Sequence, residues 1–125
     1  MIFLDTYILV WLYEGLLEKI PENIQNIMET EALFISPMVE LELNFLHEIG
    51  RITVEGPEIV RHLDAHIGIT ISRIDFYRIV EEAQHQRWTR DPFDRLIVAN
   101  ASVFQAPLIT KDERIREHYP LSIWN

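Results

Sequence analysis

The chain opens with Met1-Ile-Phe-Leu-Asp5-Thr-Tyr-Ile-Leu-Val10, in which three apolar residues lead to a carboxylate and apolar residues at helical spacing follow. This pattern predicts a short buried strand that ends before Asp5 and passes into a helix. Residues 106–115, Ala-Pro-Leu-Ile-Thr-Lys-Asp-Glu-Arg-Ile, follow the same order, with Asp112 after the apolar run. Two strand–helix units of this kind indicate a parallel sheet.

Strand-like and helix-like segments alternate along the rest of the chain, without an internal repeat or a linker. The expected strands are Ile2–Leu4, Leu33–Ser36, Ile67–Ile71, Pro107–Thr110 and Leu121–Ile123. The expected helices lie at about 6–16, 22–31, 37–49, 57–66, 75–88, 92–105 and 112–118. This alternation predicts an α/β fold, in which a parallel sheet carries helices on both faces.

Several local patterns mark where the expected helices begin and end. Ser36-Pro37 and Asp91-Pro92 each place a capping residue before a proline, which suits the first helical position. Gly50 follows the helix at 37–49, as expected of a residue that ends a helix. The helix at 75–88 should bury one face, because apolar residues recur on it at helical spacing. These residues are Phe76, Ile79, Val80 and Ala83.

The composition is typical of a soluble globular protein, with 125 residues, 48% hydrophobic and 25% charged. This length fits one domain, spanning residues 1–125. The chain has no cysteine, which suits a reducing interior, and no apolar run approaches the roughly 18 residues of a membrane span. Asp5 interrupts the apolar start and no basic region precedes it, so the N-terminus does not resemble a signal peptide. We therefore expect a cytoplasmic protein.

The net charge of −9 comes entirely from the first half of the chain. Residues 1–60 contain two basic and eleven acidic residues, whereas residues 61–125 contain nine of each. Phosphate contacts need Lys and Arg, so this balance argues against nucleic-acid binding by the acidic half. Basic residues do gather in the sequence around Asp94 and Asp112, either as solvated surface charges or as phosphate contacts. They are Arg87, Arg90, Arg95, Lys111, Arg114 and Arg116.

Four carboxylates stand out by their positions. Asp5 and Asp112 each follow the carboxyl end of an expected strand, where ligands bind in open parallel sheets, although either could simply cap the next helix. Glu42 has Phe45, Leu46 and Ile49 at helical spacing, which predicts a carboxylate on an apolar face that needs a salt bridge, a metal or a proton. Asp94 has Ile97, Val98 and Ala101 at the same spacing, although it could also serve the positive end of its helix behind the cap Asp91.

Together these four carboxylates predict a metal site. Two at strand ends and two near the starts of inward-facing helices can converge on one cleft. Carboxylates about 4 Å apart repel by roughly 4 kcal/mol per pair at an effective dielectric constant near 20, so the cluster requires protons or a cation. An oxygen-only ligand set suits Mg²⁺ or Mn²⁺ rather than zinc, and such an ion promotes phosphodiester hydrolysis.

Four stretches, in this order and spacing, resemble the PIN-domain family, in particular VapC-type ribonuclease toxins of the subgroup with a DPFDR motif. They are IFLDTYIL, ISPMVELEL, RDPFDRLIVANA and APLITKDERI, followed by the closing LSIW. The resemblance spans essentially the whole chain. It implies a five-stranded parallel sheet of order 3-2-1-4-5 in a PIN-like three-layer sandwich. It also implies a Mg²⁺- or Mn²⁺-dependent ribonuclease, a homodimer and inhibition by a cognate antitoxin.

The resemblance assigns roles by position. Asp5, Glu42, Asp94 and Asp112 become the catalytic, metal-binding acids, and one of them, Asp94 or Glu42, is the general base. Three further residues take accessory roles: Thr110 orients a carboxylate or a water, Asp91 is an accessory acid, and Thr6 either caps the first helix or contacts a ligand. Arg95, Lys111 and Arg114 are expected to hold RNA phosphates.

Two further expectations concern partners. The acidic half of the chain should help to attract a basic segment of the antitoxin, so that neutralising several acidic residues slows association. These residues are Glu14, Glu18, Glu22 and Glu29. For Trp11, Trp88 and Trp124, packing in the core or a dimer is favoured over base stacking.

Other functions remain open at this stage. The main alternative is the same fold acting as a catalytically weak binding module for a partner protein. An aspartyl phosphatase would carry a second acid two residues after Asp5, where this chain has Tyr7, and a receiver domain would carry paired acids after its first strand. Neither pattern is present.

Overall fold

The computed structural model describes residues 1–125. Its five strands form one parallel sheet in the order β3-β2-β1-β4-β5. The strands are β1 (Ile2–Leu4), β2 (Leu33–Ile35), β3 (Ile69–Ile71), β4 (Leu108–Ile109) and β5 (Ser122–Ile123). The helices are α1 (Thr6–Glu14), α2 (Glu22–Thr30), α3 (Pro37–Glu48), α4 (Gly56–Ile67), α5 (Phe76–Ala83), α6 (Pro92–Val103), α7 (Glu113–His118) and the 3-10 helix η1 (Leu17–Lys19). The predicted α/β class and strand order are confirmed.

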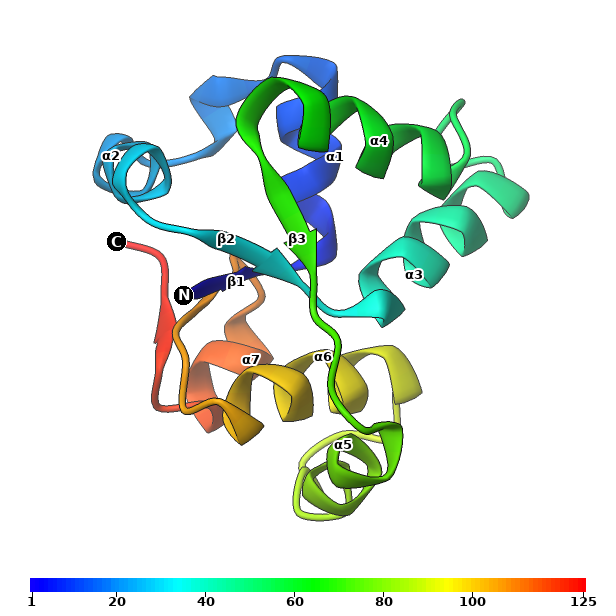
Figure 1. The fold of residues 1–125 in the computed structure, drawn as a ribbon, viewed down its shortest axis with the longest axis vertical. Helices are drawn as coiled ribbons and strands as arrows, with labels where there is room; N and C mark the ends of the chain where they lie inside the picture. The colour runs from blue at the N-terminus through cyan, green and yellow to red at the C-terminus, as the bar shows by residue number, and fades with distance from the viewer.

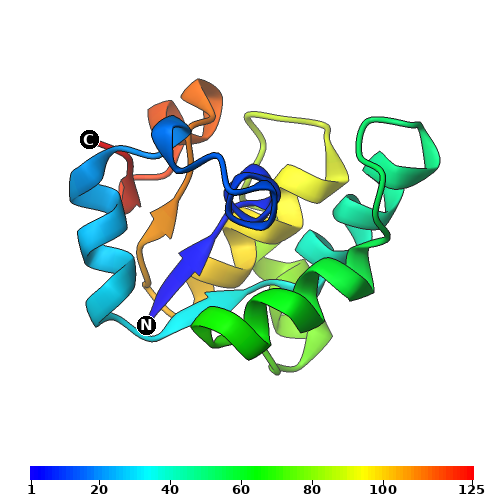
Figure 2. The ribbon, with the colours of Figure 1, turned by 90° about the horizontal axis from the view of Figure 1, so that it is seen from above.

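Helices lie on both sides of the sheet, as the alternation of strands and helices predicts. Figure 1 shows α1, α2 and α4 on one side of the strands and α5, α6 and α7 on the other. The central strands run towards the end of the molecule where α3 begins (Figures 1 and 2). The segments that leave the carboxyl ends of β1, β2 and β4 therefore start at the same edge of the sheet, where ligands bind in open parallel sheets.

The strands are short and almost fully apolar because they are covered on both faces. Phe3 and Leu4 of β1 and both residues of β4 are at most 1% exposed. The Phe3 ring lies 5.9 Å from the rings of both Phe34 and Phe104, measured between centroids. β1 and β4 pair directly, with Leu4 opposite Ile109, and this register sets the relative positions of the residues that follow them.

Several predicted boundaries shift by a few residues, for identifiable reasons. Gly68 has φ of 74° and ends α4 after Ile67, so β3 begins only at Ile69. Gly15, with φ of 73°, ends α1 in the same way, and the unpredicted η1 follows it. The helix predicted at 75–88 ends at Ala83, before a turn that leads to α6.

The stripe expected to bury one face of α5 is only partly correct. Ile79 and Ala83 are buried and pack with Ala99 of α6, but Phe76 is 63% exposed. Phe76 is the first residue of α5, just after its cap Asp75, where the helix projects beyond its neighbour α6 (Figure 1).

Gly56 allows α4 to approach α3 closely, next to Glu42. A Cβ atom at position 56 would lie 2.5 Å from the backbone oxygen of Glu40 and 3.0 Å from the backbone nitrogen of Asn44. The Asn44 side chain also accepts a 3.3 Å hydrogen bond from the Gly56 N–H. Because Gly56 has no side chain, the start of α4 can pack directly against the backbone of α3.

None of the helices has the length and apolar character that a membrane span requires.

Candidate acidic site

Asp5 lies at the carboxyl end of β1 and is held by two hydrogen bonds. Its Oδ1 accepts a bond of 2.8 Å from the Thr6 N–H, so Asp5 caps α1, and its Oδ2 accepts one of 2.6 Å from the Thr110 hydroxyl. Burial raises the pKa of Asp5, the two hydrogen bonds offset part of that rise, and repulsion from Asp112 and Asp91 adds to it. Capping and a role in the site are therefore compatible at this position.

Thr110 links the ends of the two neighbouring strands. It is fully buried directly after β4, and its hydroxyl donates to Asp5 while accepting the Asp112 N–H at 3.0 Å. Asp112 in turn caps α7, since its Oδ1 accepts the Ile115 N–H at 2.9 Å. The position of Asp112 is thus set by Thr110 on one side and by the start of α7 on the other.

Glu42 reaches the site from α3. The buried Thr6 hydroxyl donates a hydrogen bond to its Oε1. Burial raises the pKa of Glu42 to about 7, Thr6 opposes that rise, and repulsion from Asp5, Asp91 and Asp112 adds to it. The carboxylate therefore has a hydroxyl partner but lies among other acidic groups.

Asp94 reaches the site from the first turn of α6, behind the cap Asp91, whose Oδ1 accepts the Phe93 N–H at 2.9 Å. Burial raises the pKa of Asp94 to about 7, and repulsion from Asp91, Asp5, Asp112 and Glu42 adds to it. The side chain has no hydrogen-bonding partner within the protein that would offset this repulsion.

The structure thus brings the four predicted acids, and Asp91, into one electrostatically coupled group. Two threonine hydroxyls donate hydrogen bonds to acids of this group: Thr110 donates to Asp5, and Thr6 donates to Glu42. No three of the acidic or histidine side chains are arranged as a ready-made ligand set for a metal ion. The oxygen-only donors and their unfavourable mutual repulsion nevertheless fit a hard divalent cation, which would relieve that repulsion.

Two details of the sequence interpretation are corrected by the structure. The face of α3 that carries Glu42 is not the core face, because Phe45 and Ile49 are 43% and 52% exposed, and the core residues are Val39, Leu43 and Leu46. Glu42 is instead half-buried against α1. Thr6 does not cap the first helix, since Asp5 has that role and the Thr6 hydroxyl serves Glu42.

The three basic residues expected to contact phosphates differ in whether they already donate hydrogen bonds to the protein. Arg95 donates from Nε and Nη2 to the Ala83 carbonyl, at 3.2 and 3.0 Å, and so fastens the end of α5. Arg114 donates to the Trp88 carbonyl. Lys111 is exposed and its Nζ lies over the Trp11 ring. Lys111 is thus the one of the three with no hydrogen bond to the protein.

Replacing Thr110 by valine tests how far the site depends on its hydroxyl. Thr110→Val keeps the side-chain shape but leaves the Asp112 N–H and Asp5 Oδ2 without their partner. We expect a loss of about 1–3 kcal/mol in the free energy of unfolding, measured by urea denaturation. Thr110→Ser, which keeps the hydroxyl, should lose much less. Equal stability of the valine variant and the wild type would contradict this account.

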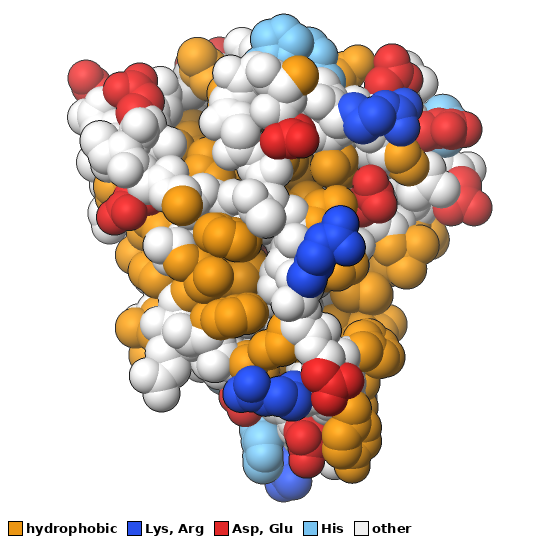
Figure 3. All heavy atoms as spheres, viewed as in Figure 1, with side chains coloured by type: hydrophobic (Ala, Val, Ile, Leu, Met, Phe, Trp, Pro, Cys, Tyr) orange, Lys and Arg blue, Asp and Glu red, His pale blue; other side chains and the backbone are white.

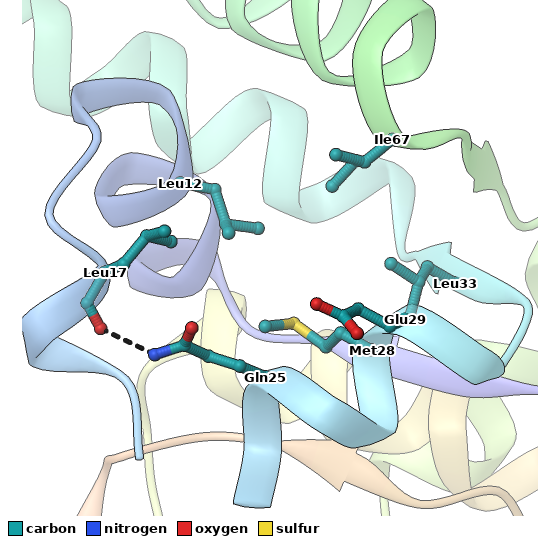
Figure 4. Close-up of a pocket in the computed structure, with 7 residues that line it drawn as sticks. All are labelled: Leu12, Leu17, Gln25, Met28, Glu29, Leu33 and Ile67. Carbon is teal, nitrogen blue, oxygen red and sulfur yellow. Dashed lines mark hydrogen bonds between the residues drawn. The ribbon is translucent and has the colours of Figure 1, made fainter. Parts of the chain in front are cut away.

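An apolar groove of about 340 Å³ lies elsewhere and shares no residue with the acids. It is lined by side chains from α1, η1, α2, β2 and α4, shown in Figure 4: Leu12, Leu17, Gln25, Met28, Glu29, Leu33 and Ile67. Leu33 is the first residue of β2, so the groove lies towards the opposite end of the strands from the acidic site.

The comparisons with known proteins agree with the fold. No curated protein matches the sequence. The VapBC2 complex from Rickettsia felis, solved bound to a DNA fragment from its promoter, contains a chain with TM-score 0.67 and 19% identity, covering 100% of this chain and 98% of that one. A toxin–antitoxin complex from Klebsiella pneumoniae contains another, with TM-score 0.61 and 20% identity, covering 98% and 96%. The family model of the PIN domain matches residues 2–119, so this chain belongs to the PIN-domain family.

Proposed function

We propose that the chain is a metal-dependent endoribonuclease of the VapC type, in which residues 1–125 form one nuclease domain, and that it is the toxin of a type II toxin–antitoxin pair. The observation that carries the proposal is the group of four acids at the carboxyl edge of a PIN-domain sheet, with the pKa values of Glu42 and Asp94 both raised to about 7. Burial and mutual repulsion of these carboxylates cost stability, whereas a site that binds a divalent cation requires carboxylates placed close together. The sequence RDPFDRLIVANA also suits the DPFDR subgroup.

The metal proposed for this site is Mg²⁺ or Mn²⁺, held by Asp5, Glu42, Asp94 and Asp112. When bound, such an ion neutralises the carboxylates, polarises a phosphoryl oxygen and lowers the pKa of a bound water. The chain itself keeps the acids available. Thr110 orients Asp5, and Thr6 orients Glu42.

Glu42 and Asp94 are the two candidates for the general base. In the metal-free chain the pKa values of both groups are about 7, so either carboxylate can take up a proton near neutral pH, as a base that accepts a proton from attacking water must. The attack breaks the bond between phosphorus and the 3′-oxygen, leaving a 5′-phosphate. Asp91, which raises the pKa of both groups, acts as an accessory acid by strengthening the local negative field.

Basic residues beside the site are proposed to hold the flanking phosphates. Lys111 and Arg114 lie on either side of Asp112 in sequence and are exposed, so they suit this role best. Arg95 can contribute charge but already donates to the Ala83 carbonyl. Each phosphate contact to a single strand should contribute about 0.7 to the slope of log K against log salt, so these few cations should give a modest salt dependence.

The proposal is tested by incubating the purified chain with a pool of cellular RNA. Cleavage is expected with Mg²⁺ or Mn²⁺, and chelation by EDTA should reduce it to background, with activity returning when excess metal is added. A metal titration of Asp112→Asn should require much more metal for the same rate. Cleavage that continues in EDTA would contradict the metal dependence, and no cleavage of any RNA would favour the alternative of a catalytically weak binding module.

We also propose a cognate antitoxin as the partner. The two structures of similar fold described above are toxin–antitoxin complexes. Glu22 and Glu29 lie on α2 and Glu18 on the adjacent η1, and Glu29 is one of the residues that line the apolar groove. Figure 3 shows acidic side chains on both the left and the right of the upper part of the face that it displays. An amphipathic segment with basic residues would complement both the apolar lining and the charge.

Neutralising these acidic residues gives a kinetic prediction. Replacing Glu18, Glu22 and Glu29 by glutamine should slow association with the antitoxin by about 10-fold at low salt, because electrostatic steering acts mainly on the on-rate. The difference should vanish at high salt. A matched variant with Glu113 and Glu117 replaced on α7 should associate normally. An on-rate that is unchanged and insensitive to salt in stopped-flow measurements would remove the electrostatic proposal.

Homodimerisation is proposed as well, since the resemblance implies it. The outer face of α3 exposes Leu41, Phe45 and Ile49, at 53%, 43% and 52%. Three large apolar side chains on one exposed face are typical of an interface. Sedimentation velocity that detects only monomers at micromolar concentration would contradict the dimer.

A further inference from the structure

Both lysines of the chain converge on one tryptophan. Lys19 and Lys111 are the only lysines, and they are separated by most of the sequence. Their Nζ atoms lie 5.8 and 5.6 Å from the centroid of the Trp11 ring. They thus place two positive charges beside one another in a chain with a net charge of −9. An indole ring attracts a nearby cation, and both lysine side chains are exposed to solvent.

This cluster is continuous with the acidic site. Tyr7 follows Asp5 by two residues, is 40% exposed, and its ring lies 6.2 Å from that of Trp11, one turn further along α1. Lys111 directly precedes Asp112. Trp124 packs against Trp11, with centroids 6.1 Å apart, and so supports it from the core. We refer to Tyr7, Trp11, Lys19 and Lys111 as the aromatic–lysine strip.

The chemistry of the strip matches unpaired nucleotides. An exposed aromatic ring stacks on a base, which is possible only if the base is not already stacked within a duplex, and ammonium groups contact the adjacent phosphates. The spacing along one helix turn suits successive groups of a strand that leaves the acidic site.

We infer that the aromatic–lysine strip binds the single-stranded segment of RNA that adjoins the scissile phosphate, with Tyr7 stacking on a base and the two lysines contacting phosphates. The inference rests on the proposed ribonuclease function for the identity of the substrate. It adds a binding strip of named residues, outside the four acids, that contacts the nucleotides next to the cleaved bond. Packing alone, the alternative expectation for Trp11, would give the strip a structural role only.

Direct binding measurements separate these roles. All variants carry Asp94→Asn, so that RNA is bound without being cut, and fluorescence anisotropy follows a labelled single-stranded oligouridine and a blunt RNA duplex. Tyr7→Leu should weaken binding of the single strand about 10-fold, which is the range for loss of one base stack. Tyr7→Phe should restore it, and the duplex should be unaffected. The control Tyr77→Leu removes an even more exposed tyrosine, on α5, and should change nothing.

The lysines are tested by the salt dependence of binding. Lys19→Gln and Lys111→Gln should each lower the slope of log K against log salt by about 0.7, the value for one phosphate contact to a single strand. Arg51→Gln removes the other basic residue of the first half and should leave the slope unchanged. A purely structural strip would alter thermal stability but neither the slope nor the preference for single strands.

The outcomes also distinguish this inference from the proposed function. If the wild type cleaves RNA but Tyr7→Leu and both lysine variants bind like their parent, the strip is refuted and the ribonuclease stands. If the strip variants lose single-strand binding but the wild type shows no metal-dependent cleavage, the ribonuclease is refuted and the binding strip stands. Loss of antitoxin affinity with unchanged RNA binding would assign the strip to the protein partner and refute the inference.

Discussion

Asp94→Asn should abolish metal-dependent RNA cleavage and at the same time make the metal-free protein more stable. We expect activity to fall by at least about 100-fold. Replacing a residue that only hydrogen-bonds to a metal ligand already lowers activity or metal affinity by roughly 10- to 100-fold, and Asp94 is proposed as a ligand itself. Stability should rise by roughly 1–2 kcal/mol at pH 8, because the amide removes a charge that burial desolvates and that four neighbouring acids repel; solvent screening at this half-buried position limits the gain. A residue that served only the fold would change both quantities in the same direction.

Initial cleavage rates and urea denaturation of the same preparations provide the measurement. Asp64→Asn is the matched control, since Asp64 is an exposed acid on α4 outside the acidic group. It should leave both the rate and the stability within error. Full activity of Asp94→Asn would refute the assignment of the acids, whereas lower stability at pH 8 would refute the electrostatic account of the site.

The sequence predicts the frame of the site well because local patterns determine it. Asp5 and Asp112 follow apolar strands, and parallel strands that are neighbours place their ends together; both facts can be read from short segments. Asp91 and Asp94 follow from the proline-marked start of α6. These residues needed only the order of the elements and the strand arrangement that the resemblance implies.

Other features depend on contacts that no local pattern encodes. Glu42 lies in the acidic group, but not for the reason that its sequence neighbours suggest, since Phe45 and Ile49 face outwards and the Thr6 hydroxyl of α1 donates to the carboxylate. Two predicted boundaries shifted where a glycine with a positive φ ends a helix, at Gly15 and Gly68. The convergence of Lys19 and Lys111 on Trp11 joins distant segments, so only the packed structure shows it.

The metal-free protein should lose stability as the pH rises from about 4 to about 7, the reverse of the usual behaviour of carboxylates. The pKa values of Glu42 and Asp94 are about 7 in the folded chain, against ordinary values of 4.5 and 3.8. Between these limits the folded state holds more protons than the unfolded state, so stability falls with pH. Well above pH 7 both carboxylates are ionised in the folded and the unfolded state, so stability no longer changes with pH because of them. After screening, we expect a loss of roughly 2–4 kcal/mol for the two groups together.

Mg²⁺ should counteract this loss, and only where the acids are ionised. At pH 8 a saturating concentration should raise the melting temperature, because the ion binds the folded state alone, whereas at pH 5 protons already occupy the acids and the ion should have little effect. The double variant Glu42→Gln, Asp94→Asn should show neither the pH slope nor the response to Mg²⁺, while Glu48→Gln, an exposed acid on the same helix as Glu42, should retain both. A metal response equal at the two pH values would mean that the ion binds elsewhere. The dependence of Mg²⁺ binding on pH therefore tests directly whether mutual repulsion among the acids is what a cation relieves.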